Sequence, residues 1–334
     1  MPGTSACAQR GSFFLLSLIS VGVTASAAVG AGDDTQPKAV QPKDGLPVPP
    51  GAPKDPQPEA KRQAAAPDPR VRLDEERRRI SAAAAAAGTD PTAIIGYYQL
   101  SFGHNDFSRG LSSNAATAVV RLPLTPNWLV QVTLPYVWAD LNGRRSFSAD
   151  GTSDLVLRTG GRLYASTDVA LFAGLDASFP AASDRRLGTG KYTLGPGLAV
   201  AAPLPRLRSL SLLLIENFNS VGGDPSRADL HYLQIQGGFN TLWSEHWWTL
   251  LTGTWSTDWN NRRRPTLNLV GQLGYRFDDH WNLFVGGGGG VVGQDTFLGL
   301  DWNVQAGVRW VFDTPLISET FFGGPAGPQG GSSP

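Results

Sequence analysis

Residues 298–312 read LGLDWNVQAGVRWVF, and this stretch decides the fold class. Its even-numbered positions, from Leu298 to Phe312, are apolar or small, while its odd-numbered positions are polar or glycine as far as Val311. Because side chains alternate between the two faces of a β-strand, this period of two sets an apolar face against a face with ionisable groups. The apolar face carries Trp302 and Trp310 near its two ends, as strands that cross a membrane do at the two interfaces.

The chain repeats this pattern about twelve times, an even number as in bacterial outer-membrane barrels. The expected strands span residues 93–103, 114–124, 127–138, 152–165, 168–180, 190–203, 208–219, 229–243, 246–258, 265–277, 280–292 and 298–312. In the seventh strand, residues 212–215 are apolar in a row, so the sequence leaves its inward face undecided. The odd-numbered connections are mostly long and the even-numbered ones mostly tight, which matches extracellular loops and periplasmic turns. We therefore predict an all-β transmembrane antiparallel β-barrel of about 12 strands over residues 91–312, with the N-terminal arm in the periplasm.

The tryptophans are expected to form two membrane girdles on this barrel, one at each interface. At the periplasmic interface we place Trp128, Trp243, Trp247, Trp281 and Trp310, and at the other interface Trp138, Trp255, Trp259 and Trp302.

Residues 1–27 resemble a secretory signal peptide. Arg10 provides the positive charge, residues 13–23 the apolar core, and Ala25-Ser26-Ala27 a small-residue cleavage site. The alternative is a retained membrane anchor, which the shortness of the core disfavours. Cys7 is the single cysteine and precedes the core, so cleavage would leave a mature chain without a thiol.

Three further segments flank the barrel. Residues 28–70 form a Pro- and Ala-rich linker that cannot bury an apolar face and is expected to be disordered. Residues 71–90 contain strong helix formers and a glycine stop, so we expect a short helix, either outside the barrel mouth, which we favour, or tucked into it. Residues 313–334 are a Gly- and Pro-rich tail, also expected to be disordered. Because the chain continues beyond Phe312, the signal that the barrel-assembly machinery recognises would be internal.

The inward polar side chains are the candidate lumen lining. They are Asp154, Arg158, Arg162, Asp176, Gln234, Gln236, Asn240, Asn268, Gln272, Arg276, Asp301, Asn303, Gln305 and Arg309. Six of them, Arg158, Arg162, Asp176, Arg276, Asp301 and Arg309, are expected to line a constriction. They either line a path for a solute or form a self-satisfied network that fills a narrow barrel, since about twelve strands give a lumen of intermediate width.

Two other features carry open alternatives. Residues 286–290 are five consecutive glycines within a strand, which either leave a wall without side chains for a ligand or lateral exit, or allow close packing and curvature. The outer loops carry Arg109, Arg144, Arg145, Arg185, Arg186, Arg227 and Arg262-Arg263-Arg264. Guanidinium groups suit anionic lipopolysaccharide or an anionic solute, but interspersed aspartates are equally consistent with an ordinary solvated loop.

Nothing in the composition indicates an enzyme, a cofactor or a nucleic-acid partner. The formal net charge is 0, with 28 basic and 28 acidic residues. His104, His231, His246 and His280 do not show metal-ligand spacing, so we expect no metal site. Ser244 near His246 leaves only a remote hypothesis of a lipase-like enzyme.

The middle of the chain carries GTSDL at 151–155, Phe179-Pro180, LGTG at 187–190 and YTLGPG at 192–197. In these motifs it resembles the MetA-pathway phenol-degradation family of outer-membrane transporters. Ala181-Ala182 stands where the family has Thr-Gly, so the match is partial. The resemblance implies an outer-membrane barrel that passes small hydrophobic or aromatic compounds, and it carries over no catalytic or binding residue.

The leading hypothesis from the sequence is an outer-membrane channel or transporter for small molecules, in contact with outer-membrane lipid. The alternative is a structural or interaction barrel with an occluded lumen, whose periplasmic arm tethers a partner.

Overall fold

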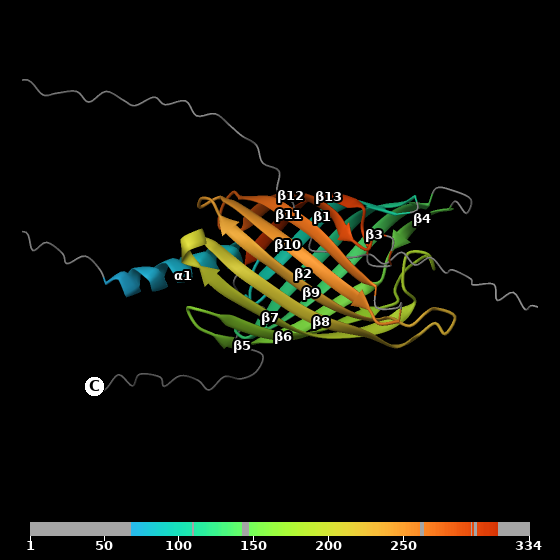
Figure 1. Cartoon of the computed structure of the whole chain (residues 1–334), viewed down its shortest axis with the longest axis horizontal. Helices are drawn as coiled ribbons and strands as arrows, with labels where there is room; N and C mark the ends of the chain where they lie inside the picture. Colours follow the sequence, from blue (N-terminus) through green and yellow to red (C-terminus); the bar gives the residue numbers. More distant parts are fainter. Residues whose placement is uncertain are drawn as a thin grey trace, which may run out of the picture.

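The computed structural model describes residues 68–108, 110–141, 147–260, 264–294, 296 and 299–312. These residues form an N-terminal helix followed by one closed antiparallel β-barrel, with the helix at one end of the cylinder (Figure 1). The prediction of a barrel of about 12 strands is confirmed. The predicted signal peptide, nearly all of the Pro-rich linker and the C-terminal tail lie outside the described residues.

The strands follow one another around the wall in chain order, and β13 closes the barrel by pairing with β1 from Gly96↔Phe312 to Asp106↔Trp302. Their bounds are β1 (Gly96–Phe107), β2 (Leu111–Thr125), β3 (Trp128–Leu141), β4 (Phe147–Thr152), β5 (Leu155–Ala165), β6 (Ala170–Phe179), β7 (Lys191–Leu204), β8 (Ser209–Gly223), β9 (His231–Leu242), β10 (Trp247–Asp258), β11 (Pro265–Arg276), β12 (Trp281–Val292) and β13 (Trp302–Phe312). A 3-10 turn, η1 (Pro205–Leu207), joins β7 to β8.

The predicted strand at 152–165 corresponds to β5, while residues 147–152, which the sequence left between two predicted strands, form the additional strand β4. β4 and β5 pair with the two ends of β3 and together occupy one position in the wall. Ser153 and Asp154 lie in the break, where the Ser153 N–H donates to the Pro135 carbonyl at 2.9 Å and the Ser153 hydroxyl to the Leu187 carbonyl at 2.6 Å. The Ser153 N–H still bonds to β3, whereas the Ser153 hydroxyl and the Asp154 carboxylate at the break bind the loop between β6 and β7.

The outer face of the wall is apolar. On β1 the outward side chains Tyr98, Leu100 and Phe102 are 44%, 45% and 57% exposed. On β13 the same face carries Trp302, Val304 and Trp310, whereas Asn303 and Arg309 on the opposite face are buried. A continuous apolar exterior of this extent suits the hydrocarbon of a bilayer. No helix in the described part of the chain is long and apolar enough to cross a membrane.

The predicted girdle tryptophans lie on the outer face, at the strand ends. Most are well exposed, while Trp255 and Trp310 are half-buried against their neighbours. Trp310 stacks on Tyr98 with ring centroids 5.7 Å apart. Trp248, which the sequence placed in neither girdle, is only 2% exposed and faces the lumen.

The helix α1 (Pro69–Ala86) enters the barrel, so the alternative that places it inside the mouth is correct and the favoured external position is wrong. Asp68 caps its first turn by accepting from the Arg70 N–H at 2.9 Å, and Pro69 occupies a position where proline is tolerated. Val71 and Leu73 in the first half remain exposed, whereas Ile80 is 1% exposed and Ala84 fully buried.

This position of α1 explains the ambiguous strand β8. Leu210 and Leu212 point inward, where Leu210 is 1% exposed and packs in one cluster with Ile80, Ala84 and Ala201. The alternate residues, among them Leu213 and Ile215, point outward and are exposed. Because the inner face of β8 packs against a helix and its outer face is exposed and apolar, both faces are apolar and the period of two disappears.

The glycine run of β12 brings backbones close together. A Cβ at Gly288 would lie 2.2 Å from the Leu269 carbonyl oxygen, and one at Gly290 would lie 2.1 Å from the Leu300 carbonyl oxygen. At these positions the glycines serve close packing of neighbouring strands, the second of the two interpretations that the sequence left open.

Candidate functional site: a plugged lumen

The chain closes one end of its own barrel. We call residues 80–95, the second half of α1 and the segment that leads into β1, the plug. The helix ends at Gly88, which has φ +67°, and the Thr89 N–H and hydroxyl both donate to the Ala84 carbonyl at 3.0 Å. Gly88 is also required by space, because a Cβ there would lie 2.6 Å from Cδ of Arg309.

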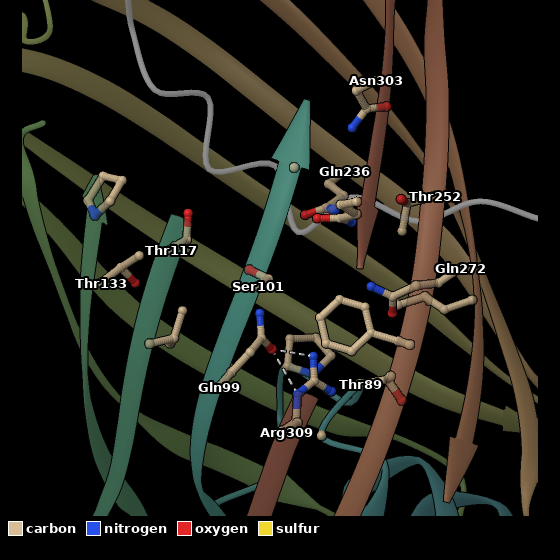
Figure 2. A pocket seen from close by; sticks show the side chains of 18 of the residues that line it. Thr89, Gln99, Ser101, Thr117, Thr133, Gln236, Thr252, Gln272, Asn303 and Arg309 are labelled. Carbon is tan, nitrogen blue, oxygen red and sulfur yellow. Dashed lines mark hydrogen bonds between the residues drawn. The ribbon is translucent and has the colours of Figure 1, made fainter. Parts of the chain in front are cut away.

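Three arginines from separate strands hold backbone carbonyls of the plug. The Arg309 Nη1 donates to the Ala87 carbonyl, the Arg121 Nη2 to the Pro91 carbonyl at 3.2 Å, and the Arg162 Nε to the Thr92 carbonyl at 3.3 Å. Arg309 is itself fixed by two bonds to Oε1 of Gln99, at 2.9 and 2.7 Å (Figure 2). We refer to Arg121, Arg162 and Arg309 as the arginine triad.

Aromatic and amide groups add to the contact between the barrel wall and the plug. The guanidinium of Arg309 lies 5.1 Å from the ring centroid of Tyr97 and 5.5 Å from that of Phe284, and that of Arg121 lies 5.6 Å from Tyr97. The Asn282 amide donates to the Ala86 carbonyl at 3.1 Å, and the Asn240 amide donates to the Thr89 hydroxyl.

Asp90 is the acidic residue of the plug. Its Oδ1 accepts from the Thr92 N–H at 2.8 Å and from the Thr92 hydroxyl at 2.7 Å. Burial raises the pKa of the Asp90 carboxyl, while these hydrogen bonds and the charges of Arg121 and Arg162 act in the opposite direction.

A second charged cluster lies on β5, β6 and β8. Arg158 forms two parallel bonds with Asp176, Nε to Oδ1 at 2.7 Å and Nη2 to Oδ2 at 2.8 Å, and its Nη2 also lies 2.8 Å from Oε1 of Glu216. Asp176 and Glu216 are 7% and 4% exposed, so their charges are separated from water. Bidentate pairing is the geometry that compensates best for such desolvation.

A cavity of about 170 Å³ lies in the lumen between the plug and the opposite end of the barrel. Tyr97, Phe284, Arg121 and Arg309 line it next to the plug. Hydroxyl and amide side chains from β1, β2, β3, β9, β10, β11 and β13 point into it, as Figure 2 shows: Gln99, Ser101, Thr117, Thr133, Gln236, Thr252, Gln272 and Asn303. The lumen therefore offers hydrogen bonds on most sides and an aromatic, positively charged floor.

At the other end of the barrel, the loop between β6 and β7 folds inward. Leu187 is fully buried against Val137, Ala139 and Ala149. The Asp154 Oδ2 accepts from the Thr189 N–H at 2.6 Å and from its hydroxyl at 2.7 Å. Asp154 thus attaches this loop to the wall at the break between β4 and β5.

Replacing Asp154 with alanine should detach this loop. The substitution removes two charge-assisted hydrogen bonds, each worth about 1.5–3 kcal/mol, and leaves the Thr189 N–H unpaired. We expect faster hydrogen exchange and faster proteolysis within residues 180–190, while the barrel stays folded. Asp184→Ala in the same loop is the control, because the described side-chain hydrogen bonds of Asp184 go to Arg186, two residues on, and not to the wall. Equal protection in both variants would contradict the role of Asp154.

The structure does not bring the six predicted constriction residues together. Arg158 and Asp176 are paired, but Arg162 and Arg309 contact the plug instead. Arg276 lies at the rim beside α1, in a groove with Glu76 and Arg79, and Asp301 precedes β13, where its N–H donates to the Asp106 carbonyl at 2.9 Å. Arg276 and Asp301 therefore lie apart from the other four, near opposite ends of the barrel, and whether those four constrict a path stays a prediction.

The other candidate lining residues are on the inner face or beside it. Strand register places Gln234, Gln236, Asn240, Asn268, Gln272, Asn303 and Gln305 inward. Asp154 lies in the break between strands. Whether any of them contacts a solute stays a prediction.

Sequence reasoning missed Arg121, Glu216 and the part of the plug that follows the helix. Arg121 lies in a run of apolar residues on β2, and an arginine in such a run was the available signal. Glu216 follows the four apolar residues of β8 that obscured the phase. The plug residues Thr89–Thr92 have no periodicity, so no pattern could place them in the lumen.

The described loop arginines bind within the loops. Arg186 pairs with Asp184 at 2.6 Å, Arg185 lies 3.5 Å from Asp224, and Arg227 donates to the Arg185 carbonyl. Arg109, Arg144, Arg145, Arg262 and Arg263 lie outside the described residues. These contacts fit the interpretation of an internally paired loop better than that of a free anion-binding surface.

Comparison with known proteins rests on structure, since no family model and no curated protein matches the chain. A solved outer membrane channel from Pseudomonas putida F1 aligns with a TM-score of 0.52 at 15% identity, over 65% of this chain and 95% of that one. The two chains share a fold. The NanC porin (TM-score 0.47, 9% identity, 64% of this chain and 98% of that one) and the KdgM porin (0.44, 8%, 64% and 99%) are less similar.

Proposed function

We propose that this protein is an outer-membrane channel for small solutes, in which the plug closes the periplasmic end. The cavity carries the proposal: a polar space enclosed by strands whose outer faces are apolar is what a solute needs to cross a bilayer. The fold shared with a solved outer membrane channel supports the location. Long loops at the end opposite α1 support a periplasmic position for the N-terminal arm.

The cavity limits the size of the solute. An engineered cavity of about 150 Å³ in another protein holds one benzene molecule. A space of about 170 Å³ therefore suits solutes of about one ring, and Tyr97 and Phe284 offer aromatic faces to them. Small aromatic solutes, as implied by the family resemblance, belong to this range.

Swelling of liposomes that contain the folded full-length protein tests the proposal. Ribose should enter and cause swelling at a rate set by the fraction of barrels whose plug is released, whereas the trisaccharide raffinose should not enter. Protein-free liposomes and liposomes with heat-unfolded protein are the controls. Absence of flux for every small solute, with the barrel shown to be folded, would refute the proposed channel.

A second candidate is an interaction barrel with a permanently occluded lumen. The plug and the inward loop at 180–190, which fill the two ends, favour it. Deleting residues 33–67, which leaves α1 and the plug in place, separates the candidates, because a channel should still conduct whereas a tether should lose its partner. Contacts with lipopolysaccharide and with the barrel-assembly machinery are part of the same proposal for an outer-membrane location.

A further inference from the structure

The arginine triad has an unusual set of partners. Among the described residues, the eight ion pairs include Arg158 but none of the three triad members. Arg121 and Arg309 are 4% and 2% exposed. Their hydrogen bonds go to neutral acceptors, namely plug carbonyls and the Gln99 amide. The two buried guanidinium charges are therefore solvated but not neutralised by these acceptors.

Arg121 has a hydrogen-bond donor without a described partner. Its Nη2 holds the Pro91 carbonyl, but its buried Nε has no hydrogen-bond partner. Nearly all buried donors in proteins are satisfied, and Arg121 lines the cavity, so its Nε–H is a donor available to an acceptor that binds there. Planar, bidentate acceptors such as carboxylates match the guanidinium fork.

Asp90 offsets part of this charge only while the plug is docked. It is near enough to Arg121 and Arg162 for the charges to act on one another, and its Oδ1 also accepts from Thr92. Asp90 is part of the plug, so it leaves the lumen whenever the plug does. With the plug withdrawn, the strands present three arginines, while the wall carboxylates Asp176 and Glu216 remain bound to Arg158.

We propose that the arginine triad is an anion-binding site for a small carboxylate, and that the plug carbonyls of Ala87, Pro91 and Thr92 occupy it in the closed barrel. A carboxylate and the plug then compete for the same donors. The adjoining cavity and the rings of Tyr97 and Phe284 accommodate a body of about one ring, so a small aromatic or short aliphatic acid fits. A role of this site in transport rests on the proposed channel, whereas binding of the carboxylate does not depend on it.

Hydrogen exchange of the full-length protein in detergent, with benzoate as the probe, tests binding without transport. Benzoate should increase amide exchange across residues 87–95 in a concentration-dependent way, because it displaces the plug. Benzyl alcohol has the same ring without the charge and should have no effect. The double variant Arg121→Gln with Arg309→Gln should lose the response to benzoate. Unchanged exchange in the wild type at saturating benzoate, or an equal response to benzyl alcohol, would overturn the proposal.

Ion selectivity in planar bilayers gives the second readout. Wild-type current across a KCl gradient should be anion-selective, and Arg121→Gln with Arg309→Gln should shift the reversal potential towards cation selectivity. Arg121→Lys with Arg309→Lys retains both charges, so it should keep the anion selectivity but lose the benzoate response. This pair also controls for folding, which heat-modifiable gel mobility reports for each variant. An unchanged reversal potential in the glutamine variant would overturn the role of the triad, whereas a benzoate response without any current would retain the site and refute the channel.

Discussion

Replacing Ile80 with aspartate is expected to open the barrel. Ile80 is 1% exposed and packs with Ala84, Ala201 and Leu210, where the plug enters the lumen. Burial of an isoleucine side chain contributes about 1.5–3 kcal/mol, and an unpaired buried carboxylate adds a further cost. Since about 1.4 kcal/mol corresponds to a factor of ten, the docking equilibrium of the plug should shift roughly 100-fold towards release. Conductance per inserted barrel in planar bilayers is the measurement.

Leu73→Asp provides the matched control for this variant. Leu73 lies in the first half of the same helix and is 42% exposed, so a carboxylate there meets solvent rather than the lumen wall. Its conductance should equal that of the wild type. If Ile80→Asp leaves the conductance unchanged while its barrel is folded, the plug does not control the path through the lumen.

The wall of the barrel was predictable because its signal is local. In β13, the alternation from Trp302 to Phe312 predicts which side chains face outward and which face the lumen. This prediction needs no information about residues elsewhere in the chain. The connection lengths add a second local signal. Where the alternation fails, as on β8, the cause is a helix from the other end of the chain.

The contacts of the plug were not predictable, because they join residues far apart in the chain. The Arg309–Ala87 bond joins residues that are 222 positions apart, and the Arg162–Thr92 bond joins residues 70 apart. Backbone carbonyls are the acceptors in both, and every residue type supplies one, so no residue pattern marks them. The sequence indicated that Arg162 and Arg309 face inward, but it could not indicate that they bind the chain itself.

Replacing Arg158 with methionine is expected to destabilise the barrel strongly. The variant would leave Asp176 and Glu216 buried at 7% and 4% exposure without their shared partner. Removing one member of such a buried cluster costs about 3–5 kcal/mol, because the remaining charges stay desolvated. The free energy of unfolding, from urea titration of the protein in lipid vesicles, should fall by this amount.

Two further variants separate the charge effect from the loss of packing around Arg158. Adding Asp176→Asn and Glu216→Gln to Arg158→Met removes the unpaired charges and should recover most of the stability, as exchange of a whole buried ion cluster for neutral groups often does. Arg162→Met on the same strand removes an arginine whose described hydrogen bond is to a neutral carbonyl, at 3.3 Å, and should cost only about 1 kcal/mol. Equal losses for Arg158→Met and Arg162→Met, or no recovery in the triple variant, would mean that the stem of Arg158, rather than its charge, stabilises this part of the lumen. We expect unequal losses, because Arg158 binds two carboxylates whereas the triad arginines bind neutral acceptors.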